Sequence, residues 1–208
     1  MKQVPYRLAE ALEFICSRKS LENITVSQIA AEAGVTRQVF YHYFDDKYEL
    51  ASWIHYVHLY QSVKLALEEN PEQMWRVSTV HWLQRLEKNQ EFYSNAFQSS
   101  SQKEFLRIIR DFFFASYQWQ LEYHVQRALN AEEIFALRSF CIGSMELVCE
   151  WIDKGVQSTP ERMQELLEAS MPELIRKIAV EFKDIPYAEA IKTMEEYISK
   201  EGLLQAIS

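Results

Sequence analysis

The sequence predicts an all-α protein with a short N-terminal helical domain followed by a larger helical bundle. Apolar residues recur at helical spacing along most of the 208 residues. The chain has only 4 glycines and 5 prolines, whereas sheets joined by tight turns usually need more of both. Alternation of apolar and polar residues, which is typical of half-buried strands, is not sustained anywhere.

The first predicted helix begins at Pro5, because proline suits the first turn of a helix. The segment from Ser17 to Asn23 breaks the helical pattern and ends it. The apolar face of this helix consists of Leu8, Ala11, Leu12, Ile15 and Cys16.

Two short helices joined by a glycine turn come next. Thr25 and Gln28 form a capping-box pattern, in which each side chain satisfies a backbone N–H at a helix start. Gly34 ends this helix, since glycine readily adopts the conformation found at helix C-termini. Thr36 can cap a second helix that runs to about Tyr43. This arrangement is a helix-turn-helix unit.

A long helix is predicted after that unit. Asp46 and Glu49 form another capping box, and the helix continues to Glu69, where Asn70-Pro71 stops it. Pro172 must kink or divide the helix that contains it. The further predicted helices cover residues 72–88, 90–97, 102–128, 131–154, 159–182 and 187–206.

The chain is predicted to contain a helix-turn-helix domain over residues 1–48 and a helical domain over residues 49–208. Charge is unevenly distributed between the N-terminal part and the rest of the chain. Residues 1–60 carry 6 basic and 7 acidic side chains, whereas the remaining residues carry 16 and 23, which together give the net charge of -8. The N-terminal part is nearly neutral. DNA binding by it would therefore depend on the placement of a few charges.

Composition argues against several other classes of protein. No apolar run approaches the ~20 residues of a membrane helix, and the N-terminus lacks a signal-peptide core. The three cysteines are odd in number and have no CxxC spacing, which indicates reduced thiols. Neither an HExxH motif nor a Glu-x-x-His motif is present. We expect a cytoplasmic protein without a membrane partner, a cofactor or a metal site.

The segment from Ile24 to Leu50 resembles the DNA-binding motif of the TetR family of bacterial regulators. The resemblance covers the T-V-x-x-I-A-x-x-A-G-V-T core that begins at Thr25, the Tyr-His-Tyr-Phe run that ends at Phe44, Lys47, and the adjacent pair Glu49-Leu50. The motif is highly specific. It implies a homodimer that binds operator DNA and whose C-terminal domain takes a small effector. The C-terminal part is faintly similar to the subgroup that includes the activator of dihydroxyacetone kinase genes.

The resemblance implies a set of DNA contacts. Arg37 and Gln38 would open the recognition helix, where arginine can pair with guanine and glutamine with adenine. Lys47 would bind a phosphate at a helix N-terminus. A solvated helix face is the alternative interpretation of the polar residues. The predicted DNA-binding residues are Thr25, Thr36, Arg37, Gln38, Tyr41, His42 and Lys47.

Numerous aromatic residues in the C-terminal part are typical of a core, and some of them can line an effector pocket. Trp82, Phe113 and Tyr117 are the predicted pocket residues. An apolar stripe on the helix over 131–154 and its continuation on the next helix suit either an intramolecular core or a dimer contact, and the resemblance favours the dimer. The predicted interface comprises Leu137, Cys141, Met145, Val148, Ile152, Met163, Leu167 and Leu174.

Three functions can be compared for a helical protein of this kind. The first is a DNA-binding repressor that is released from a palindromic operator when a small effector binds. The second is a DNA-bound regulator controlled by a protein partner. The third, a helical enzyme, lacks support, because no nucleophile–base pair, metal-ligand spacing or glycine-rich phosphate loop is present. The role of the tail over residues 185–208, the operator and the effector are left open.

Overall fold

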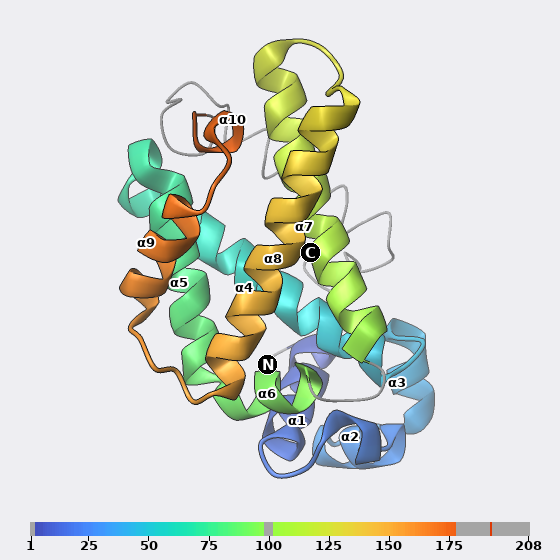
Figure 1. Cartoon of the computed structure of the whole chain (residues 1–208). Helices are drawn as coiled ribbons and strands as arrows, with labels where there is room; N and C mark the ends of the chain where they lie inside the picture. The colour runs from blue at the N-terminus through green and yellow to red at the C-terminus, as the bar shows by residue number, and fades with distance from the viewer. Residues whose placement is uncertain (1–2, 98–101, 178–191, 193–208) are drawn as a thin grey trace. The chain divides into compact units, whose positions relative to one another are not determined.

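A computed structural model describes residues 3–97, 102–177 and 192 of the chain. These residues form helices joined by turns and loops, without a strand (Figure 1), which confirms the predicted all-α class. The helices are α1 (Val4–Cys16), η1 (Leu21–Asn23), α2 (Val26–Glu32), α3 (Arg37–Tyr43), α4 (Lys47–Glu69), η2 (Pro71–Gln73), α5 (Met74–Lys88), α6 (Gln90–Phe97), α7 (Gln102–Val125), α8 (Ala131–Asp153), α9 (Pro160–Ala169) and α10 (Glu173–Arg176).

The chain folds into two compact units that do not follow chain order. The described part of the first unit consists of residues 3–57, 89–97 and 102–108, and that of the second consists of residues 58–88 and 109–177 together with Lys192. The long helices α4 and α7 each contribute to both units. A chain segment from the predicted C-terminal domain, which includes α6, therefore packs with the N-terminal helices.

In the first unit, α1 packs against α2 and α6, and α2 packs against α3. A series of aromatic rings connects three of the helices. Phe40 of α3 lies 6.0 Å from Phe44, Phe44 lies 5.7 Å from Trp53 of α4, and Trp53 lies 5.2 Å from Tyr6 of α1, measured between ring centroids. Phe40, Phe44 and Trp53 are buried. Each buried ring stabilises the unit by about 1.5–3 kcal/mol through the area it removes from water.

The predicted capping signals of the helix-turn-helix are present. The hydroxyl of Thr25 accepts from the backbone N–H of Gln28, and the Gln28 side chain accepts from the backbone N–H of Thr25. Gly34 has a φ of +64°, in the left-handed region, which glycine occupies without steric cost. The next residue, Val35, donates its backbone N–H to the carbonyl of Ala30 across the turn at 2.9 Å. This glycine turn therefore closes α2 and directs the chain into α3.

The start of α4 differs in one detail from the predicted capping box. Asp46 Oδ1 accepts from the backbone N–H groups of Tyr48 and Glu49, both at 2.8 Å. The Glu49 carboxylate, however, accepts from the backbone N–H of Asp45 and not from that of Asp46. Partial burial raises the pKa of Glu49. The cap thus reaches one residue further back along the chain than the sequence pattern suggests.

In the second unit, α5 packs along α9. The guanidinium of Arg76 on α5 donates two hydrogen bonds to the Glu168 carboxylate on α9, at 2.7 and 2.5 Å. This pair lowers the pKa of Glu168 and raises that of Arg76. A separate buried cluster, which includes Leu121, Leu137 and Phe140, holds α7 against α8.

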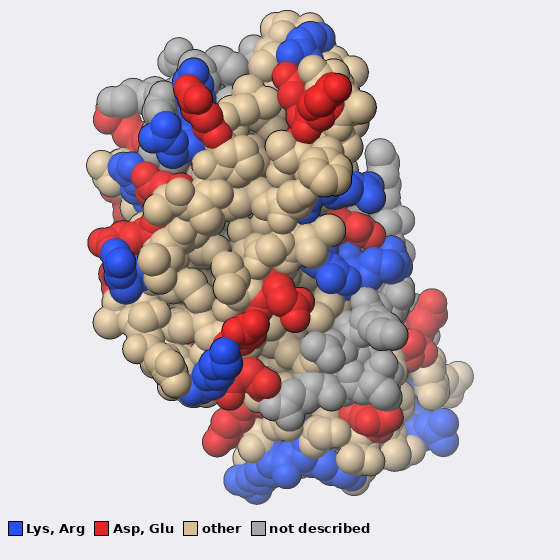
Figure 2. Space-filling model, viewed as in Figure 1, with Lys and Arg blue, Asp and Glu red and all other residues tan. Residues whose placement is uncertain are grey.

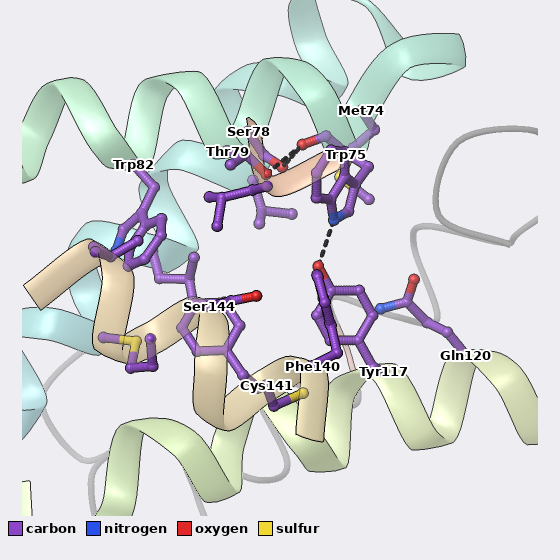
Figure 3. Close-up of a pocket in the computed structure, with 16 residues that line it drawn as sticks. Met74, Trp75, Ser78, Thr79, Trp82, Tyr117, Gln120, Phe140, Cys141 and Ser144 are labelled. Atoms are coloured by element: carbon purple, nitrogen blue, oxygen red, sulfur yellow. Dashed lines mark hydrogen bonds between the residues drawn. The ribbon is translucent and has the colours of Figure 1, made fainter. Parts of the chain in front are cut away.

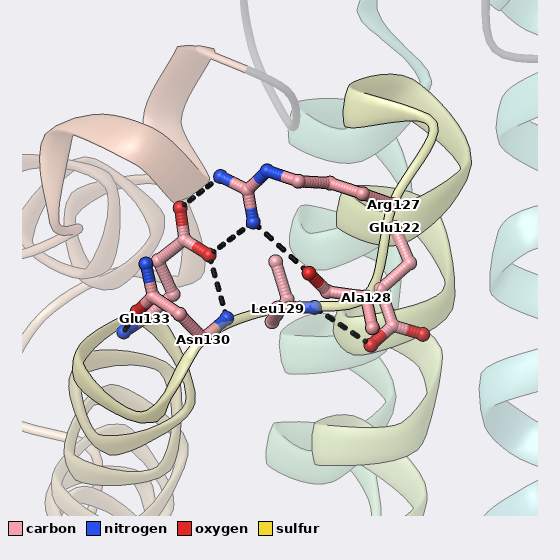
Figure 4. Close-up of polar contacts among 6 residues, drawn as sticks. All are labelled: Glu122, Arg127, Ala128, Leu129, Asn130 and Glu133. Carbon is pink, nitrogen blue, oxygen red and sulfur yellow. Dashed lines mark hydrogen bonds and ion pairs between the residues drawn. The ribbon is translucent and has the colours of Figure 1, made fainter.

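The turn between α7 and α8 is fixed by a polar network (Figure 4). Asn130 and Glu133 form a capping box at the start of α8. Arg127 donates to both oxygens of Glu133, at 2.8 and 2.7 Å, and this lowers the pKa of Glu133 to about 2. Glu122 of α7 accepts from the backbone N–H of Leu129 at 3.1 Å. The two long helices therefore meet at a well-defined corner.

The chain after α8 contains local signals that end one helix and begin the next. Gly155, with a φ of +86°, ends α8, and Thr159 caps α9, in which Pro160 is in the first turn. The helix predicted over 159–182 is divided by Pro172: α9 ends at Ala169 and α10 begins at Glu173, because proline has no backbone N–H to continue the helix. The helix predicted over 187–206 and the tail over 185–208 lie outside the described residues, apart from Lys192.

Candidate nucleic-acid interface and effector pocket

Helix α3 has one buried side and one exposed polar side. Phe40 is fully buried in the first unit, and this fixes the rotation of the helix about its axis. The four side chains predicted to read DNA, Arg37, Gln38, Tyr41 and His42, are all exposed. A short helix thus presents a guanidinium, an amide, a phenol and an imidazole on its solvent side. These groups can donate hydrogen bonds to base edges and phosphates.

Neighbouring groups order part of this surface. The Arg37 guanidinium lies 5.8 Å from the centre of the Tyr41 ring, one helical turn away, a distance that permits a cation–π attraction. His42 packs edge-on against Tyr43 at 4.9 Å. Within the described residues Arg37 has no ion pair, so its charge is available to a nucleic acid.

Thr25 and Thr36 sit where the sequence places them, at the N-termini of α2 and α3. Both are exposed, and the hydroxyl oxygen of each accepts a backbone N–H at 3.3 Å, from Gln28 and from Val39. Capping uses only one of the free N–H groups at each helix start. The remaining N–H groups and the positive end of the helix dipole can still attract a phosphate.

Lys47 has a role that the sequence reasoning missed. Its ammonium donates to the backbone carbonyls of Glu22 and Ile24, at 2.7 and 2.8 Å. It therefore links the start of α4 to the loop that precedes α2. Two of the three ammonium N–H groups are engaged in this way. The predicted phosphate contact of Lys47 thus has to share this side chain with a structural role.

The sequence also did not reveal that Arg7 contacts the turn after α2. Its guanidinium donates to the backbone carbonyls of Ala33 and Gly34, the latter at 3.2 Å. These carbonyls lie at the C-terminal end of α2, where helices leave acceptors unsatisfied, in the turn that leads to α3. Arg7 therefore positions the turn between α2 and α3. No local sequence signal reveals this contact, because 26 and 27 residues separate the partners.

The second unit contains a pocket with a volume of about 110 Å³, walled by α4, α5, α7, α8 and α9 (Figure 3). The three residues predicted for an effector pocket, Trp82, Phe113 and Tyr117, all line it. The rings of Trp82 and Phe113 lie 5.3 Å apart. The remaining lining residues are Leu59, Val63, Met74, Trp75, Ser78, Thr79, Gln120, Phe140, Cys141, Ser144, Met145, Val148 and Leu167.

One hydrogen bond crosses the pocket wall from α5 to α7. The indole N–H of Trp75 donates to the Tyr117 hydroxyl at 2.5 Å. Ser78 and Thr79 donate their hydroxyls to the Trp75 carbonyl, at 3.1 and 2.7 Å. Burial raises the pKa of Tyr117, so this phenol stays neutral at physiological pH. The wall of the pocket is thus apolar, with a few oriented hydroxyl groups.

The residues predicted for the dimer interface lie mainly on the inner side of their helices. Leu137, Cys141, Met145, Val148 and Ile152 of α8 and Met163 and Leu167 of α9 are buried within their own chain, and Leu174 is half-buried. Four of them, Cys141, Met145, Val148 and Leu167, line the pocket.

A different set of apolar residues faces solvent on α8 and α9. Phe135 is 75%, Ile142 49%, Leu147 53% and Leu166 47% exposed. A groove of about 240 Å³ between the two helices contains Leu147 and Leu166. Figure 2 shows a broad area without charged side chains over α8 and α9, bordered by acidic and basic residues. The periodic stripe of α8 is buried within its own chain, and periodicity does not reveal which side chains face a partner.

Comparison with known families decides the identity of the fold. Residues 10–52 match the family model described as bacterial regulatory proteins, tetR family. Residues 73–173 match a TetR model described as transcriptional regulator C-terminal region.

The chain belongs to the TetR family. It is a DNA-binding transcription regulator and not an enzyme, which confirms both expectations from the sequence. No curated protein sequence matches the chain.

Solved structures of TetR-like regulators share the fold at low identity. The dihydroxyacetone kinase operon activator DhaS is 20% identical, with a TM-score of 0.57, over 85% of this chain and 97% of that chain. FadR from Bacillus subtilis in complex with stearoyl-CoA is 13% identical, with a TM-score of 0.52, over 84% and 98%. The fatty acid degradation regulator FadR from Bacillus halodurans is 14% identical, with a TM-score of 0.51, over 80% and 93%.

Two further properties bear on partners of this TetR-family chain. Within the described ranges, none of the helices combines the length and apolar character needed to cross a bilayer. The same residues contain no group of three or more histidine, cysteine, aspartate or glutamate side chains arranged to hold a metal ion.

Proposed function

We propose that this protein is a homodimeric repressor that binds a palindromic operator in the cytoplasm and is released when a small molecule occupies the pocket of the second unit. The observation that carries the proposal is the pairing of an exposed polar recognition helix with an uncharged pocket in one chain. The first supplies contacts to DNA, and the second supplies a site for a signal.

The recognition step rests on α3. Arg37 and Gln38 are in its first turn, directly after the Thr36 cap. In a helix-turn-helix, the N-terminal residues of the second helix contact base edges in the major groove. Arg37 would read guanine and Gln38 adenine, each with about 1–3 kcal/mol of discrimination. Tyr41 and His42, one turn later, would contact the backbone or thymine methyl groups.

The dimer is supported by the exposed apolar surface of α8 and α9. Contiguous apolar patches on a soluble protein mark interaction sites, and Phe135, Ile142, Leu147 and Leu166 supply four large side chains. Two copies of an α8–α9 pair can form a four-helix interface. We therefore propose that these exposed side chains, rather than the buried stripe, make the dimer contact. Two copies of α3 would then read a palindrome, because operator symmetry mirrors protein symmetry.

Helix α4 is the proposed route from the pocket to the recognition helix. It begins at Lys47, whose ammonium holds the loop before α2. Further along the same helix, Leu59 and Val63 line the pocket. A ligand that displaces these two side chains would move the helix. Two recognition helices bind major grooves about 34–36 Å apart, so a shift of a few Å would weaken binding.

The pocket also bears on the alternative in which the effector is a protein. A regulator controlled only through its surface would have a solidly packed C-terminal domain. The second unit instead contains a cavity of about 110 Å³ beside Tyr117. This observation favours a small-molecule effector.

Selection of bound duplexes from a random DNA library tests the recognition step. The wild-type protein should enrich a palindrome whose half-sites are separated by about one helical repeat. Arg37→Ala should lose the preference at one base pair in each half-site while keeping the spacing. Arg162→Ala, which removes an exposed arginine of α9, is the matched control and should enrich the wild-type sequence. Enrichment of no sequence, or of one without two-fold symmetry, would contradict the proposal.

A further inference from the structure

The pocket offers no charge to a ligand. None of its sixteen described lining residues is acidic, basic or a histidine. The two weak acids in the wall stay protonated, because burial raises the pKa of Cys141 to about 12 and also raises that of Tyr117. Placing an isolated carboxylate or phosphate in such surroundings costs several kcal/mol. The lining therefore selects against anionic and cationic ligands.

The size of the pocket limits the ligand to about one ring. Its volume is about 110 Å³, and an apolar cavity of about 150 Å³ in another protein stays dry and accommodates benzene. A long acyl chain would need a larger or differently shaped space. The pocket therefore differs in scale from one that encloses a fatty acyl group.

The walls favour a planar ligand. Trp82 and Phe113 contact each other at an angle of 60°, and Tyr117 and Phe140 meet at 6.1 Å and 76°. Tilted and edge-to-face arrangements of this kind are the preferred contacts between aromatic rings. A further aromatic ring can continue the same packing. Trp75, Trp82 and Phe113 therefore form a suitable surface for an aromatic ligand.

Two hydroxyl groups can orient such a ring. The Tyr117 oxygen already accepts from Trp75, so its own proton is available to an acceptor in the pocket. The side chain of Ser144, on the opposite helix α8, points into the space between α5 and α7 (Figure 3). Within the described residues Ser144 makes no side-chain hydrogen bond. A single ligand oxygen beside these two hydroxyls could accept from one and donate to the other.

We propose that the pocket recognises a neutral, single-ring aromatic compound with one hydroxyl or carbonyl oxygen, of the class that includes phenols, benzyl alcohols and aromatic aldehydes. The proposal rests on the assignment of this pocket as the effector site. It names the chemistry of the ligand: the ring packs against Trp82 and Phe113, and the oxygen binds Tyr117 and Ser144.

Titration calorimetry with the full chain, in the absence of DNA, tests the ligand class with four probes: phenol, toluene, benzoate and decanol. Phenol should bind with one site per chain. Toluene lacks the oxygen and should bind about 25-fold to 100-fold more weakly, the effect of losing the hydrogen bonds to both Tyr117 and Ser144. Benzoate, which is anionic, and decanol, which is long, should give no saturable binding.

Two variants of Ser144 test the position of the ligand. Ser144→Ala should weaken phenol binding about fivefold to tenfold and leave toluene binding unchanged, a split that a general disturbance of the fold would not produce. Ser144→Leu should fill the space and abolish the binding of both. Ser27→Leu makes the same change at an exposed position of α2, in the first unit, and should leave both affinities unaltered, and thermal unfolding shows whether each variant is folded.

Several outcomes would overturn the proposal. Benzoate or decanol binding more tightly than phenol would show that the pocket prefers charge or length. Phenol and toluene of equal affinity would remove the role of the hydroxyls, and failure of all four probes would remove the ligand class altogether. The calorimetry uses no DNA, and the DNA selection experiment uses none of the four small molecules. Failure of the proposed ligand class can therefore be distinguished from failure of the proposed DNA-binding function.

Discussion

Helices α3 and α8 differ in what they turn toward solvent. Helix α3 buries Phe40 and exposes polar groups such as Arg37 and Gln38. Helix α8 buries an apolar stripe and also exposes large apolar side chains, among them Phe135, Ile142 and Leu147. A helix that packs on one side only needs no apolar residues on its other side. The polar outer side of α3 suits a nucleic acid, whereas the exposed apolar side chains of α8 suit the protein interface proposed above.

The two helices also differ in how they are held. Helix α3 has 7 residues, too few for a helix to be stable by itself. It depends on the Thr36 cap, on Phe40, and on the turn that Arg7 fixes through Ala33. Helix α8 has 23 residues and a long buried face, so single contacts matter less to it. The following predictions test these differences, from the largest expected effect to the smallest.

The buried side of α3 should contribute far more to the stability of the protein than its exposed side. Phe40→Ala leaves a cavity among Phe44 and Trp53 and should lower the free energy of unfolding by about 3–5 kcal/mol. Tyr41→Ala removes an exposed ring from the same helix and should change that free energy by less than about 0.5 kcal/mol. Urea denaturation measures both. Equal losses would show that the two sides of α3 are not distinct.

The exposed apolar side chains of α8 should form the dimer interface. Leu147→Glu places a carboxylate in the proposed interface, where an unpaired charge costs about 3–5 kcal/mol, so the dimer dissociation constant should rise at least about a hundredfold. Leu65→Glu, at an exposed leucine of α4, is the matched control and should leave it unchanged. Sedimentation equilibrium measures the constant. A fully dimeric Leu147→Glu protein would place the interface elsewhere.

The caps of the two helices should contribute similarly to stability but differ in their effect on DNA binding. Thr36→Ala removes the acceptor for the Val39 N–H and should cost about 1 kcal/mol. Thr36→Ser keeps the hydroxyl and should restore most of that loss. Asn130→Ala at the start of α8 should cost a similar amount without altering DNA binding, whereas Thr36→Ala should also weaken it. Chemical denaturation and a DNA-binding titration separate the two effects.

The carboxyl at the start of α8 should make a small pH-dependent contribution to stability. Arg127 and the Asn130 N–H lower the pKa of Glu133 from 4.5 to about 2. Because the folded pKa is below the unfolded one, this contribution is fully present above about pH 4.5 and is lost as the pH falls toward 2. Arg127→Ala should remove most of it. The difference in unfolding free energy between wild type and variant should therefore shrink over that window, and a constant difference would contradict the assignment.

Local signals in the sequence were sufficient for much of the fold. The caps at Thr25, Thr36 and Asn130 and the glycine turn at Gly34 involve residues a few positions apart, so a short segment contains all the information they need. Pro172 could be interpreted in the same way, as a break that separates α9 from α10.

Contacts between distant residues were not predictable in this way. Lys47 and the carbonyl of Ile24 are 23 residues apart, and nothing in either segment indicates the other. Hydrophobic periodicity showed that Leu137 and Met145 would be buried, but burial by a partner and burial by the same chain leave the same pattern. The aromatic residues Trp82, Phe113 and Tyr117 do line a pocket, whereas Ser144, which points into that pocket, carried no signal of its own.

The absence of charge in the walls of the pocket has a consequence for the cell as well as for the ligand. A solute that matches such walls is neutral and mostly apolar, and solutes of that kind also partition into the interior of a bilayer at little cost, unlike ions. An effector of this class would reach the protein by diffusion through the cell envelope without a dedicated carrier. The concentration outside the cell would then set the occupancy of the pocket, and the regulator would report on the surroundings rather than on metabolism.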